Sequence, residues 1–122
     1  EMLPHDQLTA MLTAADLFIC PSIYEPLGIV NLEAMGCETA VLGSRVGGIP
    51  EVVADKETGE LVDYNGEAAP FEKALTESIT RLMSQPDLLK KYGAAGRARA
   101  QKLFGWDAVA DLTVDLYRRV IV

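Results

Sequence analysis

The sequence has few basic residues, few cysteines and no long hydrophobic run. Lys and Arg number 11 against 18 Asp and Glu, which gives a net charge of −7. This charge argues against a nucleic-acid partner, because phosphate backbones are bound by clustered Lys and Arg. Basic residues gather within 90–102, but they are scattered around a predicted helix, and we interpret them as a solvated face. No apolar run reaches membrane-spanning length and no signal peptide opens the chain, so we expect no transmembrane segment and a cytoplasmic location.

The cysteines and the histidine also exclude whole classes of site. Cys20 and Cys37 lack the number and the spacing of a disulfide framework or a metal site. Both lie in apolar surroundings, so we expect buried free thiols of a cytosolic protein. His5 has no Ser, Cys or second His in register for a catalytic triad or a metal site, and we expect it at the surface.

The composition that remains is that of one soluble globular domain. The chain has 122 residues, of which 49% are hydrophobic and 24% charged, enough for one domain and too few for two. It opens with Glu-Met-Leu-Pro, in the style of a loop between elements. We therefore expect an internal piece of a longer protein.

Short apolar runs and helical patterns alternate through the first half of the chain. The patterns predict helices over 6–15, 28–36 and 50–54, and buried strands over 17–20, 40–43 and 60–62. Asp6 is the expected N-cap of the first helix. In the second helix Ile29, Leu32 and either Met35 or Gly36 are expected on one side. Strands that alternate with helices across short connections predict an α/β fold with a right-handed, Rossmann-like parallel sheet of about three strands and helices on both faces.

The second half is predicted to be a helical tail. Apolar residues at helical spacing run from Phe71 to Met83, Pro86 starts a helix that continues to Leu103, and Gly105 separates it from a last amphipathic helix. Trp106 and Tyr117 in that last helix are expected to be core aromatics. Three strands make a small sheet for six helices. We therefore expect some apolar surface to be covered by a partner outside the chain.

Two carboxylates in the segment 21–51 indicate a ligand-binding site. Glu25 and Glu33 are separated by seven residues, and Pro26 and Gly28 force a tight turn where a loop leads into a helix. The free N–H groups of a helix start attract anions, and nearby carboxylates accept hydrogen bonds from hydroxyls. Ligands of parallel sheets bind beyond the carboxyl ends of the strands, where loops 21–28 and 44–48 emerge. The pattern therefore predicts a nucleotide or a nucleotide-sugar ligand.

Each of these residues also has a plainer interpretation. Glu25 is compatible with an exposed loop carboxylate, and Glu33 with a surface residue of a helix. Gly47 and Gly48 fit a simple turn as well as the close approach of a ligand. Arg45 lies on the ligand side of the sheet, where we favour a solvated Arg over a phosphate contact.

The ordered motifs resemble the C-terminal part of retaining glycosyltransferases of family 4, which have the two-domain GT-B fold. The resemblance runs from His5 to Val122. It is strongest in Pro21–Gly28, in Glu33–Met35, and in the Gly-Gly-Ile-Pro-Glu run that begins at Gly47. Within the family the chain is most similar to bacterial glycogen synthases of the actinobacterial type. These enzymes move glucose from ADP- or UDP-glucose to an α-glucan or a small phosphorylated acceptor.

The resemblance implies a role for each candidate residue. Glu25 would be the catalytic residue, binding hydroxyls of the donor glucose and stabilising positive charge at its anomeric carbon. Donor binding would use the N–H groups of Leu27, Gly28 and Ile29 for the distal phosphate and the carboxylate of Glu33 for the ribose. The candidate loop contacts are Tyr24, Gly47 and Gly48. The family stabilises its leaving group with basic side chains and helix N–H groups, so we expect no cofactor and no metal ion.

The resemblance also implies that residues 1–122 form one partial domain, the latter half of a nucleotide-sugar-binding domain. Residues 104–122 would be a C-terminal helix that packs back toward an N-terminal domain, which would bind the carbohydrate acceptor. Family members carry an Arg and a Lys for the diphosphate upstream of the matched region. This sequence contains neither those cations nor the acceptor domain, so we expect the chain alone to be inactive.

Two positions depart from the family pattern. Glu38 stands where the family has a helix-capping Gly, which costs about 1 kcal/mol unless Gly36 caps the helix one turn earlier. Arg45 stands where relatives often carry a small polar residue.

Three other functions remain open. One is a family 4 hexosyltransferase of the mannosyl or sucrose type, and another is a non-catalytic nucleotide-sugar-binding module. The third is a glycosidase, since paired carboxylates are its chemistry. The apolar helix around Glu33 disfavours the glycosidase.

Overall fold

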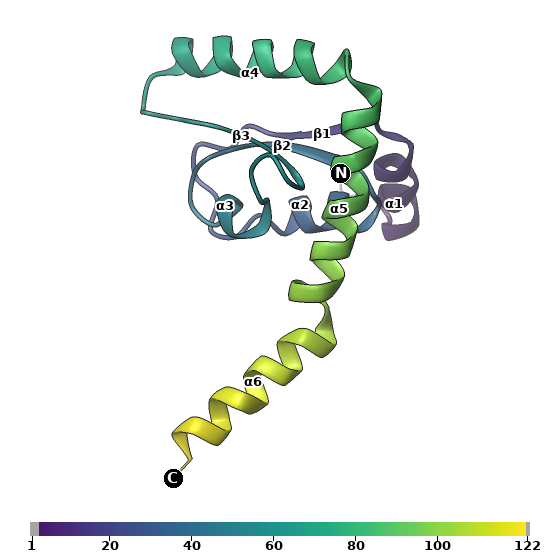
Figure 1. The fold of residues 1–122 in the computed structure, drawn as a ribbon. Coiled ribbons are helices and arrows are strands. Elements are labelled where there is room, and N and C mark those ends of the chain that lie inside the picture. The colour runs from purple at the N-terminus through teal and green to yellow at the C-terminus, as the bar shows by residue number, and fades with distance from the viewer. Residues whose placement is uncertain (1–2, 122) are drawn as a thin grey trace.

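The computed structural model describes residues 3–121, which form an α/β sheet domain followed by helices (Figure 1). The elements in chain order are α1 (His5–Ala14), β1 (Leu17–Cys20), α2 (Ile29–Gly36), β2 (Ala40–Ser44), α3 (Ile49–Val52), β3 (Gly59–Val62), α4 (Ala68–Met83), α5 (Pro86–Phe104) and α6 (Trp106–Val120).

The three strands form one parallel sheet with β2 in the centre. Leu17 of β1 lies opposite Ala40, and Val41 of β2 lies opposite Gly59. Each strand begins and ends within one residue of its predicted bounds, because short apolar runs that end at Pro or Gly allow few alternatives. The parallel α/β sheet predicted from the sequence is confirmed.

Helices cover both faces of this sheet (Figure 1). Side chains of β2 alternate between the faces, as a pleated strand requires. Val41 packs in a core with residues of α1, α2 and α3, whereas Ala40 and Leu42 pack in a second core with residues of α4 and α5. Figure 1 shows α5 running past the sheet from the level of α4 to the level of α2. Its last residue, Phe104, packs against the first core.

Two glycines allow α5 to pack closely against the end of α2. A Cβ at Gly93 would overlap the carbonyl oxygen of Glu38, and one at Gly96 would lie 3.2 Å from Cγ of Met35. Glu38 has a φ of 61°, the left-handed conformation expected where the family has Gly. Gly36 remains the last residue of α2 and does not take over the cap. The Glu38 carboxylate instead pairs with Arg97 of α5 at 3.6 Å.

A buried carboxylate ties β3 to α4 and α5. Glu60 is 3% exposed and accepts hydrogen bonds from both terminal nitrogens of Arg81 and, at 3.4 Å, from the hydroxyl of Tyr92. Lys56 Nζ lies 2.7 Å from its second oxygen. Burial alone would raise the pKa of Glu60, but Arg81 and Lys56 outweigh it and hold this pKa below its ordinary value.

Several expectations about helix faces are wrong. Pro4, not Asp6, is the N-cap of α1, and Asp6 lies in the first turn. Helix α2 buries Asn31, Ala34 and Met35, whereas Ile29 is 63% exposed. Residues 31, 34 and 35 share one face of the helix, and Ala34 and Met35 of this face pack in the first core, with Leu32 half-buried against it.

Other side chains are more exposed than predicted. Cys20 is buried as expected, but Cys37 is half-buried, and both thiols are free. Met83 and Leu103 are exposed, because they lie at helix ends that extend past the sheet. Of the basic residues in 90–102, most are exposed as predicted. Arg99 instead donates to the carbonyl oxygens of Glu51 and Val52, each at 2.9 Å, and so caps the end of α3.

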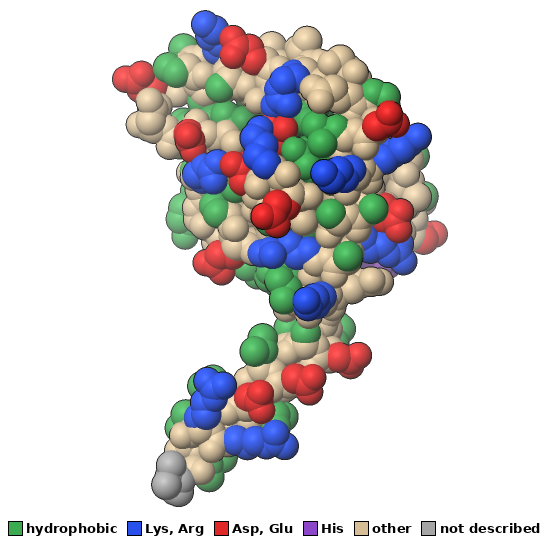
Figure 2. All heavy atoms as spheres, viewed as in Figure 1, with side chains coloured by type: hydrophobic (Ala, Val, Ile, Leu, Met, Phe, Trp, Pro, Cys, Tyr) green, Lys and Arg blue, Asp and Glu red, His purple; other side chains and the backbone are tan. Residues whose placement is uncertain are grey.

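Helix α6 extends away from the sheet domain (Figures 1 and 2). None of its residues is buried, and Trp106 and Tyr117 are 89% and 59% exposed. The prediction that these two are core aromatics is therefore wrong for the described chain. The apolar spacing made α6 amphipathic, but no element of residues 3–104 covers its apolar side. No helix within residues 3–121 has the length and the apolar character needed to cross a bilayer.

Candidate functional site

The candidate site lies at the carboxyl ends of β1 and β2, where two loops meet. The first loop leads from β1 into α2 and the second from β2 into α3. Ser44 Oγ donates to the carbonyl oxygen of Ser22, and the Gly48 N–H donates to the carbonyl oxygen of Glu25 at 3.0 Å. The structure therefore brings together the two loops that the parallel topology predicted as neighbours.

Gly47 and Gly48 make this approach sterically feasible. A Cβ at Gly47 would overlap the Glu25 carbonyl oxygen, and one at Gly48 would lie 2.6 Å from Cα of Leu27. Gly47 also has a φ of 51°, which favours glycine. The sequence alone was compatible with two roles for these glycines, a simple turn or the close approach of a ligand. The structure adds a third reason for these glycines, which is the packing of one loop backbone on the other.

The start of α2 presents N–H groups beside a carboxylate. Gly28 is the N-cap, with a φ of 86°, and its N–H donates to Oε1 of Glu25 at 3.1 Å. The N–H groups of Leu27 and Ile29 make no hydrogen bond to any residue within 3–121. Such groups carry the partial positive charge of a helix start. Phosphate oxygens are their natural acceptors.

Glu33 lies on the second turn of α2, half-buried, and faces α1. Together with Leu3, His5 and Leu8 it lines a pocket of about 370 Å³. His5 is exposed as predicted, but sequence reasoning missed that it lies beside Glu33. A helix that precedes a strand of a parallel sheet runs antiparallel to it, which places the start of α1 at the edge that carries the site. This order of elements was the signal that could have placed His5 there. Tyr24, the remaining loop candidate, is 82% exposed beside Glu25.

Asn31 has an environment that the sequence did not reveal. Its side chain is fully buried, and within the described chain neither amide atom has a hydrogen-bond partner. Asn31 Nδ2 lies 2.5 Å from the point that a Cβ of Gly28 would occupy. The available signal was a polar residue within an apolar helical pattern, and the predicted inner face of α2 did not include it.

Arg45 is held by two carboxylates at the same edge of the sheet. Its Nη2 lies 2.6 Å from Asp55 Oδ2 and its Nε lies 2.7 Å from Asp63 Oδ1. The other oxygen of Asp55 accepts the Leu61 N–H at 2.9 Å. Both carboxylates raise the pKa of Arg45. Burial opposes ionisation of Asp55, but the Arg45 guanidinium and the Leu61 N–H outweigh it, so the pKa of Asp55 lies below its ordinary value. Arg45 is thus an ion-paired residue, although its side chain is 41% exposed.

The charges at this edge do not by themselves suit a diphosphate. Glu25 and Glu33 are both acidic, and the guanidinium of Arg45 is already engaged by Asp55 and Asp63. Like charges repel most strongly where water is excluded. A diphosphate at the start of α2 therefore requires cations from outside the described residues.

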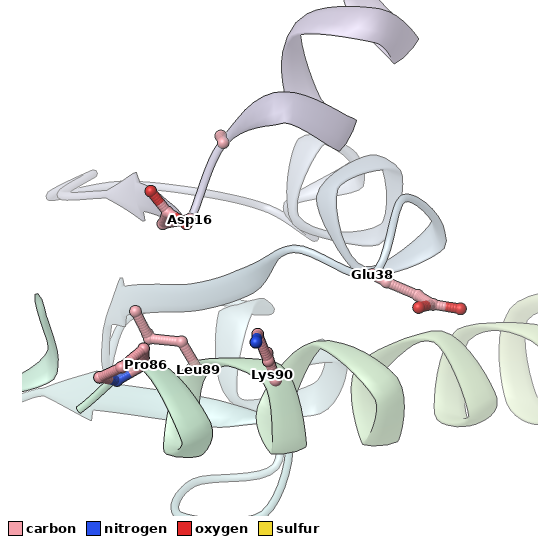
Figure 3. Close-up of a pocket in the computed structure, with 6 residues that line it drawn as sticks. Asp16, Glu38, Pro86, Leu89 and Lys90 are labelled. Atoms are coloured by element: carbon pink, nitrogen blue, oxygen red, sulfur yellow. The ribbon is translucent and has the colours of Figure 1, made fainter.

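A second, smaller pocket lies at the opposite end of the sheet (Figure 3). It has a volume of about 110 Å³ and is lined by Ala15, Asp16, Glu38, Pro86, Leu89 and Lys90. Figure 3 shows the carboxylate of Glu38 directed away from Asp16, so the two do not converge on one point. Because Asp16 and Glu38 precede β1 and β2, this pocket is separate from the site at the carboxyl ends.

A three-stranded parallel sheet with helices on both faces, and with a helix start and carboxylates at its carboxyl edge, defines the class. It is the α/β architecture of part of the C-terminal domain of a GT-B glycosyltransferase. A family model described as "Glycosyl transferases group 1" matches residues 2–99. The chain belongs to the group 1 glycosyl transferase family.

Three similar proteins place the chain within this family. "Alpha-maltose-1-phosphate synthase" of Mycolicibacterium smegmatis is 51% identical over 98% of the chain, which covers 31% of that protein. "MMP alpha-(1->4)-mannosyltransferase" of Mycolicibacterium hassiacum is 37% identical over 98% of the chain, which covers 28% of that protein. The structure of sucrose-phosphate synthase from Thermosynechococcus elongatus matches with a TM-score of 0.84 and 38% identity, over 98% of this chain and 29% of that one.

The chain thus spans about a third or less of the length of these relatives. The names of these relatives describe different reactions, but each name refers to the transfer of a sugar or to the synthesis of a sugar phosphate. The predicted resemblance to the C-terminal part of GT-B glycosyltransferases of family 4 is confirmed at the level of the group 1 family. The finer likeness to glycogen synthases is not specifically shown.

Proposed function

We propose that this chain is the donor-binding part of a retaining glycosyltransferase that moves glucose from ADP- or UDP-glucose to an α-glucan or a small sugar phosphate. The observation that carries the proposal is the Glu25 carboxylate beside the N–H groups that start α2, with Gly28 N–H and Glu25 Oε1 3.1 Å apart. The N–H groups suit a phosphate, and the carboxylate suits sugar hydroxyls. The name of the M. smegmatis relative supports a sugar-phosphate product.

In this proposal the donor lies along the carboxyl edge from α3 toward α1. The N–H groups of Leu27, Gly28 and Ile29 hold the distal phosphate. Glu33 binds the ribose hydroxyls, and the pocket beside Glu33 receives the base, since that pocket is lined by the apolar Leu3 and Leu8 and by His5. Tyr24 and the Gly47-Gly48 turn flank the sugar.

The chemistry follows from where charge develops. As the bond from the anomeric carbon to the diphosphate breaks, positive charge grows on the sugar and negative charge on the leaving group. Glu25 stabilises the former, and the start of α2 stabilises the latter through oriented N–H groups. Basic residues from the rest of the complete protein neutralise the diphosphate, and the transfer needs no metal ion. Transfer that persists in EDTA would support this last point, and transfer restored only by a divalent ion would contradict it.

Helix α6 has a place in the same proposal. Its exposed apolar residues include Leu112, Leu116 and Val120, at 67%, 57% and 70% exposure. We infer that in the complete natural protein this side packs against the acceptor-binding domain, and that the protein acts in the cytoplasm, consistent with two free thiols.

A hexosyltransferase of another donor or acceptor fits about equally. The mannosyltransferase from M. hassiacum and the sucrose-phosphate synthase are named for such reactions. In this proposal the edge binds the phosphate, the ribose and the hexose hydroxyls, which glucose and mannose donors share.

The test is transfer by the complete natural protein. ADP-glucose, UDP-glucose and nucleotide-activated mannose are each offered with an α-glucan, with sugar phosphates and with sucrose precursors. Release of nucleoside diphosphate and the mass of the product are measured. Glucose transfer to glucan or sugar phosphate supports the proposal, and transfer of mannose selects the alternative. Hydrolysis of an aryl glucoside without transfer would overturn both.

A further inference from the structure

The fully buried side chain of Asn31 is not explained by packing. Within residues 3–121 its Nδ2 and Oδ1 atoms have no hydrogen-bond partner. A buried amide without partners costs stability, whereas a leucine of the same branched shape would occupy the space without that cost. Unsatisfied polar groups of this kind are rare in folded proteins. Their retention at the expense of stability is typical of sites that need them for function.

The amide of Asn31 and the side chain of Glu25 both approach Gly28. Asn31 is the third residue of α2, so its side chain is directed back toward the helix start. Its Nδ2 lies 2.5 Å from the point that a Cβ of Gly28 would occupy, and Cγ of Glu25 lies 3.5 Å from the same point. Cγ1 of Ile49 also lies 3.5 Å from this point. Because Gly28 has no Cβ, it places no side-chain atom of its own between the amide and the Glu25 side chain.

The Glu25 carboxylate occupies an anion position at the start of α2. Its Oε1 accepts the Gly28 N–H at 3.1 Å, so the carboxylate caps α2. The proposed function gives this same N–H to the donor phosphate. A carboxylate and a phosphate repel each other and compete for one donor. Donor binding therefore requires Glu25 to leave the Gly28 N–H.

We propose that Asn31 is a positioning residue that receives the Glu25 carboxylate when phosphate takes the Gly28 N–H. This inference rests on the proposed function. Rotation about the side-chain bonds of Glu25 moves one carboxylate oxygen from the Gly28 N–H to Asn31 Nδ2. The other oxygen is then free to accept hydroxyls of the sugar. The exchange couples phosphate binding to the placement of Glu25, and it gives a hydrogen bond to an amide that has no partner among the described residues.

The test is a double-mutant cycle on nucleotide binding by the complete natural protein, with ADP and UDP as probes and calorimetry as the readout. Asn31→Leu should weaken binding about tenfold, because a hydrogen bond to the displaced carboxylate is lost. Glu25→Ala should tighten binding several-fold, because the competitor for the Gly28 N–H is gone. The double variant should bind like Glu25→Ala, and Asn31→Leu without ligand should melt at or above the wild-type temperature.

Each opposite result overturns the inference. Equal affinity of Asn31→Leu and wild type would do so, and so would a loss that persists when Glu25 is already Ala, since Asn31 would then act without Glu25. If Asn31→Leu does not fold, Glu25→Ala decides alone, and unchanged or weaker binding contradicts the exchange. A wild type that binds neither ADP nor UDP overturns the proposed function as well. A wild type that binds while no variant differs from it overturns only the role of Asn31.

Discussion

Glu25 and Glu60 are two carboxylates of the same sheet domain in opposite environments. Glu60 is buried and has two cations and a hydroxyl around it. Glu25 is half-buried, and its side chain has one backbone N–H, that of Gly28, at 3.1 Å. A carboxylate whose acceptor sites are filled by its own chain holds the fold together. A carboxylate with free acceptor sites at a sheet edge is available to a ligand.

The strongest test of this contrast is Glu25→Gln in the complete natural protein. We expect hexose transfer to fall about 100- to 1,000-fold, because an amide does not stabilise the positive charge of the transition state. The free energy of unfolding should change by no more than about 0.5 kcal/mol. Glu57→Gln, an exposed acidic residue away from the edge, is the matched control for transfer and unfolding. Near-normal transfer by the Glu25 variant would remove Glu25 from the chemistry.

The backbone of Glu25 is supported by a contact with the second loop of the site. Gly47 lets the second loop support the backbone of Glu25, so Gly47→Ala should destabilise the protein by about 2–3 kcal/mol and reduce transfer. Gly66→Ala is the control, because Gly66 also has a positive φ, 94°, but its Cβ would meet nothing within 4 Å. It should cost about 1 kcal/mol and leave transfer unchanged. Urea unfolding measures both, and equal costs would show that the loop contact is unimportant.

Glu60→Gln tests whether the buried carboxylate of Glu60 stabilises the fold. We expect a loss of about 2 kcal/mol in the free energy of unfolding, because Arg81 and Lys56 lose a charged partner while the site stays buried. The figure is moderate because both cations are partly exposed, at 44% and 60%. Transfer per folded molecule should not change. A variant as stable as wild type would show that burial cost and ion pairing cancel at Glu60.

The smallest expected effect is the acid dependence of stability. The folded-state pKa of Glu60 lies below its ordinary value of 4.5, so the unfolded state binds more protons at acid pH. The contribution of Glu60 is therefore fully present above about pH 5 and is lost as the pH falls through the folded-state pKa. Unfolding free energy measured from pH 6 to pH 3 should fall less steeply in Glu60→Gln than in wild type. Identical slopes would assign the acid dependence to other carboxylates such as Asp55.

Much of the fold could be predicted because its signals are local. Pro21 follows the apolar run 17–20, the turn that contains Gly47 and Gly48 follows the second run, and Gly59 precedes the third, so each strand is confined to a few residues. Burial on α2 could not be predicted, because the inner face depends on how the helix leaves its loop. The exposure of Trp106 could not be predicted either. The apolar spacing of its helix indicates a face that packs against another element, but it does not identify that element.

The sequence by itself determined the parallel α/β sheet, its strand bounds, and the placement of Glu25 at a helix start. These depend on the order of apolar runs and turn residues, which act over a few positions. Only the tertiary structure decided that the Glu25 carbonyl oxygen accepts the Gly48 N–H, that Asn31 is buried without a hydrogen-bond partner among residues 3–121, and that Arg45 is ion-paired. Those outcomes depend on contacts between residues that are far apart in the chain, or on the exact angle of one helix. Spacing along the sequence does not encode either one directly.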